Sequence, residues 1–119
     1  MTAVAKHGVL VYANDIQAVA NFYQALFNMR VVRQTAELIS LMQDGFNIII
    51  HLPPIEMPQP VFSSVKVFMT VDSLSAARAK AVELGGQAYD GEWANPIFKV
   101  CNIADSDGNV IQLREFFAA

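Results

Sequence analysis

The feature that most constrains the fold of this chain of 119 residues is a repeated order of expected elements. Residues 8–52 and residues 65–116 both read as one strand, one helix and three further strands. Each unit is too small to bury both faces of its own sheet, so the two units are expected to pack together and leave a cleft between their curved sheets. The repeat therefore predicts an α+β protein built from two βαβββ modules.

The first module opens with a strand signal followed by a helix signal. Residues 8–13 are β-branched and aromatic, whereas the apolar residues over about 15–27 recur at the three-and-four spacing of an amphipathic helix. Asn14 or Asp15 can cap the start of this helix, and Asn28 suits the left-handed residue that ends it. We expect the apolar stripe to face the core; it consists of Ile16, Val19, Ala20, Tyr23, Leu26 and Phe27.

Three strand-like runs complete the first module, at 29–35, 37–43 and 46–52. Asp44 and Gly45 separate the last two runs and are a strong signal for a two-residue hairpin. These runs are therefore expected to form an antiparallel meander.

The second module repeats this order. Residues 65–71 read as a strand, and Asp72 or Ser73 can cap the helix that follows, so that Asp15 and Asp72 would start equivalent helices. The apolar stripe of this helix is Leu74, Ala77, Ala81 and Leu84, and Gly85-Gly86 ends it. Strand-like runs follow at 87–90, 97–103 and 110–116.

A proline-rich segment separates the modules. Residues 53–60 hold four of the five prolines, which can neither donate to a central sheet nor continue a helix. We interpret 53–60 as a semi-rigid connector. The expected organisation is a single domain over 1–119, with module one at about 7–52 and module two at about 64–117.

Composition excludes several kinds of partner. Hydrophobic residues make up 54% and charged residues 16%, which argues against disorder and suggests that surplus apolar surface lines a pocket or a subunit interface. The net charge is −3 and no basic run could follow a phosphate backbone, so nucleic acid is not an expected partner. No membrane segment or signal peptide is evident, and a cytoplasmic location is expected.

At this point the chain resembles the vicinal oxygen chelate superfamily, which includes glyoxalase I, bleomycin resistance proteins and extradiol dioxygenases. The resemblance covers nearly the whole chain. It rests on LVYANDIQAVANFYQALFNMRVV, on VFMTVDS and on NIADSDGNVIQLRE, in that order. The resemblance implies that the eight strands of two βαβββ modules form an incomplete barrel around a ligand cleft, within a homodimer.

The resemblance also implies four positions for metal ligands, on the first and last strand of each module. In this chain they correspond to Gly8, His51, Lys66 and Gln112. His7 lies one residue too early, so it should face the other side of its strand unless a bulge turns it. A lysine ammonium repels a divalent ion by several kcal/mol at about 4–5 Å, and no carboxylate in the set offsets that cost. The set therefore argues against a metal cofactor.

Alternation along the strands indicates which side chains line the cleft. In the strand that opens module two, Val65, Val67, Met69 and Val71 share one face, which should meet the helix. Lys66, Phe68 and Thr70 then turn toward the cleft, as do Gln112 and Arg114 in the last strand. The expected ligand-binding residues are His51, Lys66, Phe68, Gln112, Arg114 and Trp93, the last from a loop expected over the cleft, with Tyr89 as a further candidate.

The sequence therefore favours a small-molecule-binding member of the superfamily that uses no catalytic metal. Its expected partner is a small organic ligand, anionic or aromatic, and no catalytic residue is assigned. The alternative is a metal-dependent lyase, isomerase or dioxygenase of the same superfamily, in which His7, His51 and Gln112 hold a divalent metal ion. That alternative requires His7 and His51 to converge.

Overall fold

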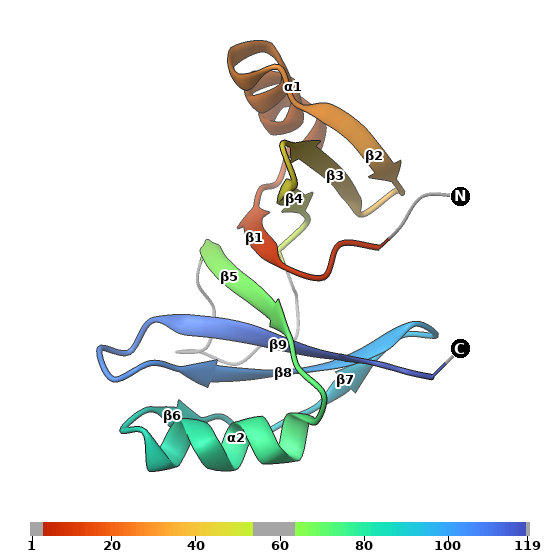
Figure 1. The fold of residues 1–119 in the computed structure, drawn as a ribbon. Helices are drawn as coiled ribbons and strands as arrows, with labels where there is room; N and C mark the ends of the chain where they lie inside the picture. Colours follow the sequence, from red (N-terminus) through yellow and green to blue (C-terminus); the bar gives the residue numbers. More distant parts are fainter. Residues whose placement is uncertain (1–3, 54–63, 119) are drawn as a thin grey trace.

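One mixed sheet runs through both modules of the protein (Figure 1). The computed structural model describes residues 4–53 and 64–118, so most of the expected connector 53–60 lies outside the described residues. The first module contains β1 (Gly8–Tyr12), α1 (Ile16–Phe27), β2 (Arg30–Gln34), β3 (Leu38–Gln43) and β4 (Phe46–His51). The second contains β5 (Val65–Thr70), α2 (Leu74–Glu83), β6 (Gln87–Ala88), β7 (Trp93–Ala94), β8 (Phe98–Ala104) and β9 (Val110–Phe116).

The strand order confirms the two modules and shows how they join. The order is β2-β3-β4-β1-β5-β9-β8-β6, with β7 paired to β8. Each module pairs its first and last strands in parallel, and the antiparallel pair β1–β5 connects the modules. The sheet is open and has nine strands instead of eight, because the expected strand at 87–90 shrinks to β6 and a second two-residue strand, β7, forms in the segment expected to be a loop.

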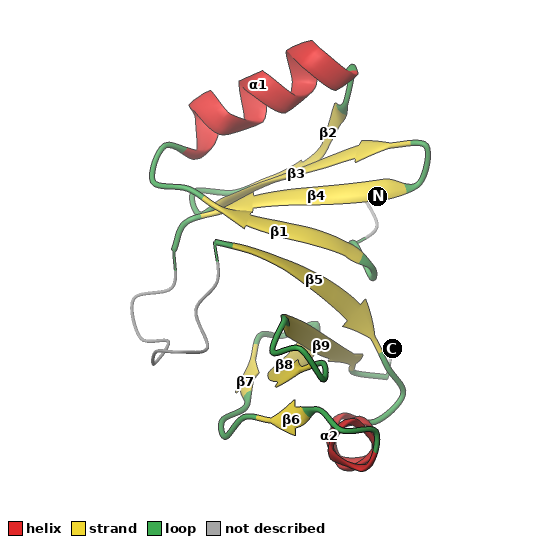
Figure 2. Cartoon of the chain, turned by 90° about the vertical axis from the view of Figure 1, so that its left-hand side faces the viewer, coloured by secondary structure: helices red, strands yellow, loops and turns green. Residues whose placement is uncertain are grey.

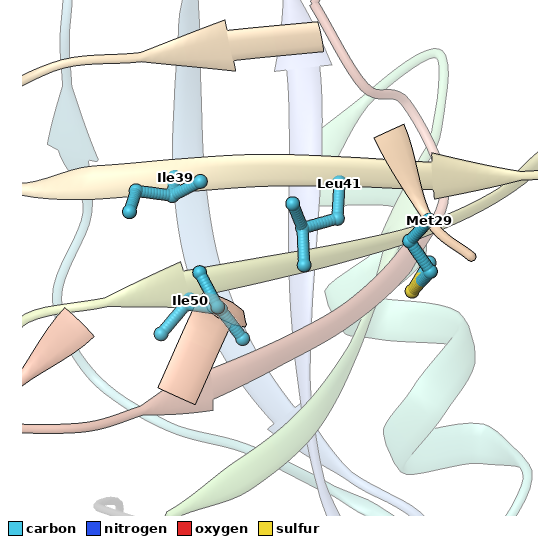
Figure 3. Close-up of a cluster of buried hydrophobic side chains, with 5 residues drawn as sticks. Met29, Ile39, Leu41 and Ile50 are labelled. Atoms are coloured by element: carbon cyan, nitrogen blue, oxygen red, sulfur yellow. The ribbon is translucent and has the colours of Figure 1, made fainter. Parts of the chain in front are cut away.

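Helix α1 ends where its capping residues predict. The Asp15 carboxylate accepts a hydrogen bond from the Ala18 N–H at 3.0 Å, and Asn28 closes the helix in the left-handed region at φ 56°. Residue Ala20 is fully buried against a cluster from β3, β4 and the segment before β2, formed by Met29, Ile39, Leu41 and Ile50 (Figure 3). The burial of these apolar side chains stabilises the packing of α1 against the sheet.

The apolar stripe of α1 is shorter than expected. Tyr23 still packs against the core, but Leu26 and Phe27 are exposed. The chain reverses at Asn28 and brings Met29 into the cluster, so the last turn of the helix has no strand to cover.

The N-cap of helix α2 is Ser73, one residue after Asp72, which the sequence pairs with Asp15 as the start of an equivalent helix. The Ser73 hydroxyl accepts a hydrogen bond from the Ala76 N–H at 3.1 Å. Leu74 is buried with Cys101 and Leu113, as the helical pattern predicts. The expected stripe residue Leu84 is instead the exposed C-cap, because the chain turns away at Gly85 with φ +94°.

The aliphatic face of β5 does not meet a helix as expected. Val65, Val67 and Met69 are 54%, 44% and 43% exposed, and only Val71 packs beside α2. Figures 1 and 2 show the reason: α1 covers strands of the first module and α2 covers strands of the second, while β5 runs between them. Neither helix therefore covers the apolar face of β5 formed by Val65, Val67 and Met69.

The turns follow the sequence signals closely. Both Asp44 and Gly45 have positive φ, at 51° and 81°, as a tight hairpin between β3 and β4 requires.

Within the described residues, no helix is long and apolar enough to span a membrane.

Candidate ligand-binding pocket

The side of the sheet opposite the helices carries a cavity of about 370 Å³ between the modules. Its size falls within the range of small-molecule pockets. The first module and the strands β7, β8 and β9 of the second contribute its walls. The lining residues are Leu10, Tyr12, Arg33, Thr35, Glu37, Leu38, Ile49, His51, Trp93, Ala94, Asn95, Phe98, Val100, Gln112 and Arg114.

Arg114 on β9 is the most strongly organised polar group of this pocket. Its guanidinium carbon lies 3.9 Å from the ring centroid of Phe68 and 4.6 Å from that of Phe98. Its Nε donates to Gln112 Oε1 and its Nη1 donates to the carbonyl of Ala5, both at 2.9 Å. Two aromatic rings and two hydrogen bonds therefore fix the plane of the guanidinium.

The remaining nitrogen of this guanidinium, Nη2, is not enclosed in the protein interior. Among residues 4–53 and 64–118, no hydrogen-bond partner is found for Arg114 Nη2, and no buried side-chain nitrogen or oxygen is left unsatisfied. Nη2 is thus not sealed off in the protein interior, and Arg114 lines the pocket. Burial lowers the pKa of Arg114 to about 10, the nearby Tyr12 opposes that shift, and the charge of Arg33 adds to it. The side chain remains cationic at neutral pH.

Phe68 and Lys66 lie on the pocket side of β5, but neither side chain is part of the pocket lining. Phe68 is fully buried under Arg114, and Lys66 is 2% exposed. Lys66 Nζ donates to Asn102 Oδ1 at 3.3 Å and lies 5.3 Å from the ring centroid of Tyr12. Burial lowers the pKa of Lys66 to about 8. The structure thus places both residues behind the pocket wall, where they support it.

His51 and Tyr12 form the far wall. They are opposite each other in the β1–β4 pair, with ring centroids 6.0 Å apart in an edge-to-face arrangement. His51 Nδ1 lies 2.7 Å from the carbonyl oxygen of Leu52, which favours the tautomer with a proton on Nδ1. Burial raises the pKa of Tyr12 to about 12, with the opposing influence of Arg114, so Tyr12 is a neutral phenol at physiological pH.

Of the two aromatic candidates in the second module, only Trp93 lines the pocket. It belongs to β7, which pairs with β8 at the pocket edge, and it is 40% exposed. Its ring lies against Gly91, where an added Cβ would come within 2.6 Å of the indole. Tyr89 is not among the lining residues. In total, His51, Gln112, Arg114 and Trp93 reach the pocket among the six residues expected to bind ligand.

The strand registers revise one of the four implied metal positions. Matching the caps Asp15 and Ser73 makes Gly8 equivalent to Lys66, and Leu10 equivalent to Phe68. Leu10 pairs with Ile49 and Phe68 pairs with Gln112, so Ile49 is the equivalent of Gln112. His51 instead corresponds to Arg114, which lies two residues after Gln112 on β9.

These positions do not fit a divalent ion. A Cβ on Gly8 would collide with the carbonyl oxygen of Asn47 and come within 3.0 Å of the Phe68 ring, so the ring fills the space of an inward ligand there. Lys66 supplies an ammonium, Ile49 supplies no donor, and Gln112 Oε1 already accepts from Arg114. Among the described residues, no group of three or more His, Cys, Asp or Glu side chains could hold a metal.

The structure also separates the two histidines of the alternative metal site. His7 precedes β1, and His51 pairs with Tyr12 at the other end of that strand, about 16 Å away at about 3.3 Å per residue. His7 is exposed, and its Nδ1 accepts a hydrogen bond from the Thr70 N–H at 3.3 Å. The convergence that a site of His7, His51 and Gln112 requires is absent from this geometry.

Sequence reasoning missed the contribution of β2 and of the turn after it. Arg33, Thr35 and Glu37 all line the pocket. Alternation could have identified Tyr12, which shares a strand face with Leu10. It could not have identified Arg33, because a register irregularity between Val31 and Arg33 breaks the alternation.

The fold defines a small α+β protein in which two βαβββ modules flank a cavity. A family model described as a glyoxalase-like domain matches residues 8–114, and the chain belongs to this family. This confirms the resemblance to the glyoxalase, bleomycin resistance and dioxygenase superfamily. A comparison with curated proteins finds no significant match.

Solved structures support the same fold. A glyoxalase/bleomycin resistance protein/dioxygenase superfamily member from Vibrio splendidus 12B01 is 15% identical with a TM-score of 0.66, and 96% of this chain and 100% of that chain are covered. Methylmalonyl-CoA epimerase from Mycobacterium tuberculosis is 16% identical with a TM-score of 0.64, at 99% and 94% coverage. A structure described as NAD-dependent benzaldehyde dehydrogenase from Legionella pneumophila is 12% identical with a TM-score of 0.73, at 93% and 99% coverage. At such identities these structures show the fold alone.

Proposed function

We propose that the pocket binds a small organic anion with a flat apolar part, and that it does so without a metal ion. The observation that carries this proposal is the guanidinium of Arg114, which lies against two aromatic rings in the pocket lining and whose Nη2 has no hydrogen-bond partner among the described residues. A guanidinium in a partly dehydrated site binds a carboxylate through charge-assisted hydrogen bonds more strongly than one at an open surface.

The composition of the walls supports the same ligand class. The whole chain has a net charge of −3, yet the pocket is lined by two arginines and a single carboxylate, Glu37. Leu10, Ile49 and Val100 give it an apolar surface on which a ring can pack. A polar anion-binding group beside apolar walls is the arrangement expected for an amphipathic acid.

The donor chemistry favours binding over metal-assisted catalysis. The positions that would hold a metal carry a glycine, an isoleucine, a lysine and a glutamine, and the glutamine oxygen is engaged by Arg114. Sequestration of a small molecule, as in the antibiotic-binding relatives of the superfamily, requires a shaped pocket only. We therefore place the protein among the ligand-binding members of its superfamily.

Benzoate and benzamide test this function because they share shape and differ in charge. NMR titration of the labelled protein at pH 7 should show benzoate binding at least about tenfold more tightly than benzamide, since a charge-assisted hydrogen bond contributes about 1.5–3 kcal/mol. Arg114→Gln should abolish that difference. Arg114→Lys should keep part of it, because lysine retains the charge but lacks the planar fork.

Arg30→Gln is the matched control. Arg30 lies on β2 outside the pocket, so its replacement removes the same charge and should leave both affinities unchanged. Adding EDTA should also change neither affinity. Equal binding of the two compounds, or binding that disappears with EDTA, would refute the proposal.

We also propose that the protein is a cytoplasmic homodimer. The support for a dimer is the uncovered apolar face of β5, which carries Val65, Val67 and Met69. A soluble monomer seldom leaves such a contiguous strip of aliphatic side chains in water, and a second copy of the chain would bury it.

A further inference from the structure

A second arginine, Arg33, faces the same pocket from the other module. Arg33 belongs to β2 and Arg114 to β9, which lie on opposite sides of the β1–β5 junction in the sheet. Both line the cavity, together with apolar residues of the central strands. The pocket thus has one cation on a wall from each module.

A bulge in β2 turns Arg33 toward the cavity. Val31 pairs with Leu41, but Arg33 pairs with Ser40, so β2 contains one more residue than β3 across this interval. Ser40 lies in register with Ile49, a pocket residue, whereas its neighbour Ile39 belongs to the core under α1. Without the bulge, Arg33 would lie opposite Ile39 and face the helix side.

Gln34 shows that the ordinary alternation of side chains resumes after the bulge. Gln34 pairs with Ile39, and its side chain donates to Gln17 on α1 at 3.4 Å. The residue after Arg33 therefore lies on the helix side, as alternation requires. A bulge that directs one side chain into a cavity commonly marks a functional position.

Neither arginine has a charged partner in the described part of the chain. The ion pairs found there join Lys80 to Glu83, and Lys99 to Glu92 and Glu115. The charge of Arg33 contributes to the lowered pKa of Arg114, so the two cations repel each other. Glu37 also lines the pocket, but it forms no ion pair with either arginine in this structure.

We propose that the ligand is a small organic dianion, such as a dicarboxylate, with one acidic group on Arg114 and the other on Arg33. This inference rests on the proposed function and narrows it from an organic anion to a dianion that bridges the two modules. Each acidic group neutralises one cation, which relieves the repulsion between the two arginines. Arg114 is the deep, fixed anchor, and Arg33 sets the length and charge that the site accepts.

The experiment compares dicarboxylates with their own monoamides, which have nearly the same shape and one charge fewer. The probes are isophthalate with 3-carbamoylbenzoate, terephthalate with 4-carbamoylbenzoate, and the alkanedioates from succinate to suberate with their monoamides. Affinities are measured by NMR titration at pH 7 on the wild-type protein, Arg33→Gln and Arg30→Gln. The range of lengths is included so that one member matches the span between the two guanidinium groups.

We expect at least one dicarboxylate to bind about tenfold more tightly than its monoamide. Arg33→Gln should remove this advantage, because it should weaken binding of the dicarboxylate more than binding of its monoamide. Arg30→Gln, a change of the same charge on the same strand outside the pocket, should retain the advantage. Arg33 is half-buried on β2 and packs in no core cluster, so its variant is expected to fold.

The outcomes separate the two proposals. If benzoate binds through Arg114 but no dicarboxylate exceeds its monoamide, the dianion inference is wrong and the proposed function stands. The same conclusion follows if Arg33→Gln weakens dicarboxylate and monoamide equally, or if Arg30→Gln matches its effect. If neither benzoate nor any dicarboxylate binds, both proposals fail.

Discussion

Two cationic side chains, Lys66 and Arg114, are 2% and 5% exposed on the pocket side of the sheet. Burying a charge is unfavourable unless polar or aromatic groups replace the lost water. Arg114 meets that requirement with two aromatic faces and two hydrogen bonds, and Lys66 has the Asn102 amide oxygen and the Tyr12 ring. The polar residues Asn102 and Gln112 thus support the cations of the site.

Lys66 should make stability depend on pH in the alkaline range. Its pKa falls from 10.5 to about 8 on burial, so between these values the unfolded chain binds the proton and the folded chain does not. Stability therefore rises with pH through this window, by up to roughly 3 kcal/mol, and below pH 8 the full penalty of the buried charge remains. Urea denaturation at pH 7 and pH 10 measures this change.

The variant Lys66→Met isolates the effect. The wild type should gain stability relative to Lys66→Met between pH 7 and pH 10, because only the wild type loses the buried charge. Contributions from Tyr12 and Arg114 are common to both proteins and cancel in the comparison. Lys80→Met, at a side chain that is 61% exposed, should show no such gain. A difference that stays constant with pH would mean that burial does not lower the pKa of Lys66.

The capping residues show what the sequence indicates at the scale of single elements. Asp15, Asn28 and the Asp44-Gly45 hairpin all act as their residue types predict, because caps and tight turns depend on local backbone geometry. The sequence left Asp72 and Ser73 as equal candidates for the cap of α2. Only the structure shows that the Ser73 hydroxyl reaches the Ala76 N–H.

Single substitutions at these two positions test the assignment. Ser73→Ala should cost about 1 kcal/mol of unfolding free energy, since it leaves a helix N-terminal donor without its acceptor. Asp72→Ala should change stability by less than about 0.5 kcal/mol. Both values come from urea denaturation at pH 7. A larger loss for Asp72→Ala than for Ser73→Ala would contradict the cap seen in the structure.

At the scale of the whole molecule, the uncovered face of β5 is the main departure from expectation. Alternation correctly divides β5 into two faces. The buried Phe68 lies on one face and the exposed Val67 lies on the other. It gives no information on which strands each helix covers, and that depends on the strand order of the sheet. The aliphatic face consequently lies between the helices, and neither helix covers it.

A homodimer makes a simple prediction. Light scattering after size-exclusion chromatography should give twice the 13.1 kDa mass of the chain. Val67→Lys should shift the mass to that of a monomer, because a lysine at the centre of the uncovered face would place charge in an apolar interface. Val82→Lys, at a valine on α2 that is 56% exposed against 44% for Val67, serves as the control. A monomeric wild type, or a dimer that Val67→Lys leaves intact, would overturn the assignment of this face.

The sequence by itself determined the two modules, the caps of α1, the hairpin and the residues of β9 that reach the pocket, since each of these follows from local backbone preference or strand alternation. The tertiary structure decided which cations share a cavity. It placed Lys66 behind the pocket wall, filled the space at Gly8 with the Phe68 ring, and used a bulge to turn Arg33 toward Arg114. Register and the meeting of distant strands arise from long-range packing, which no local pattern encodes.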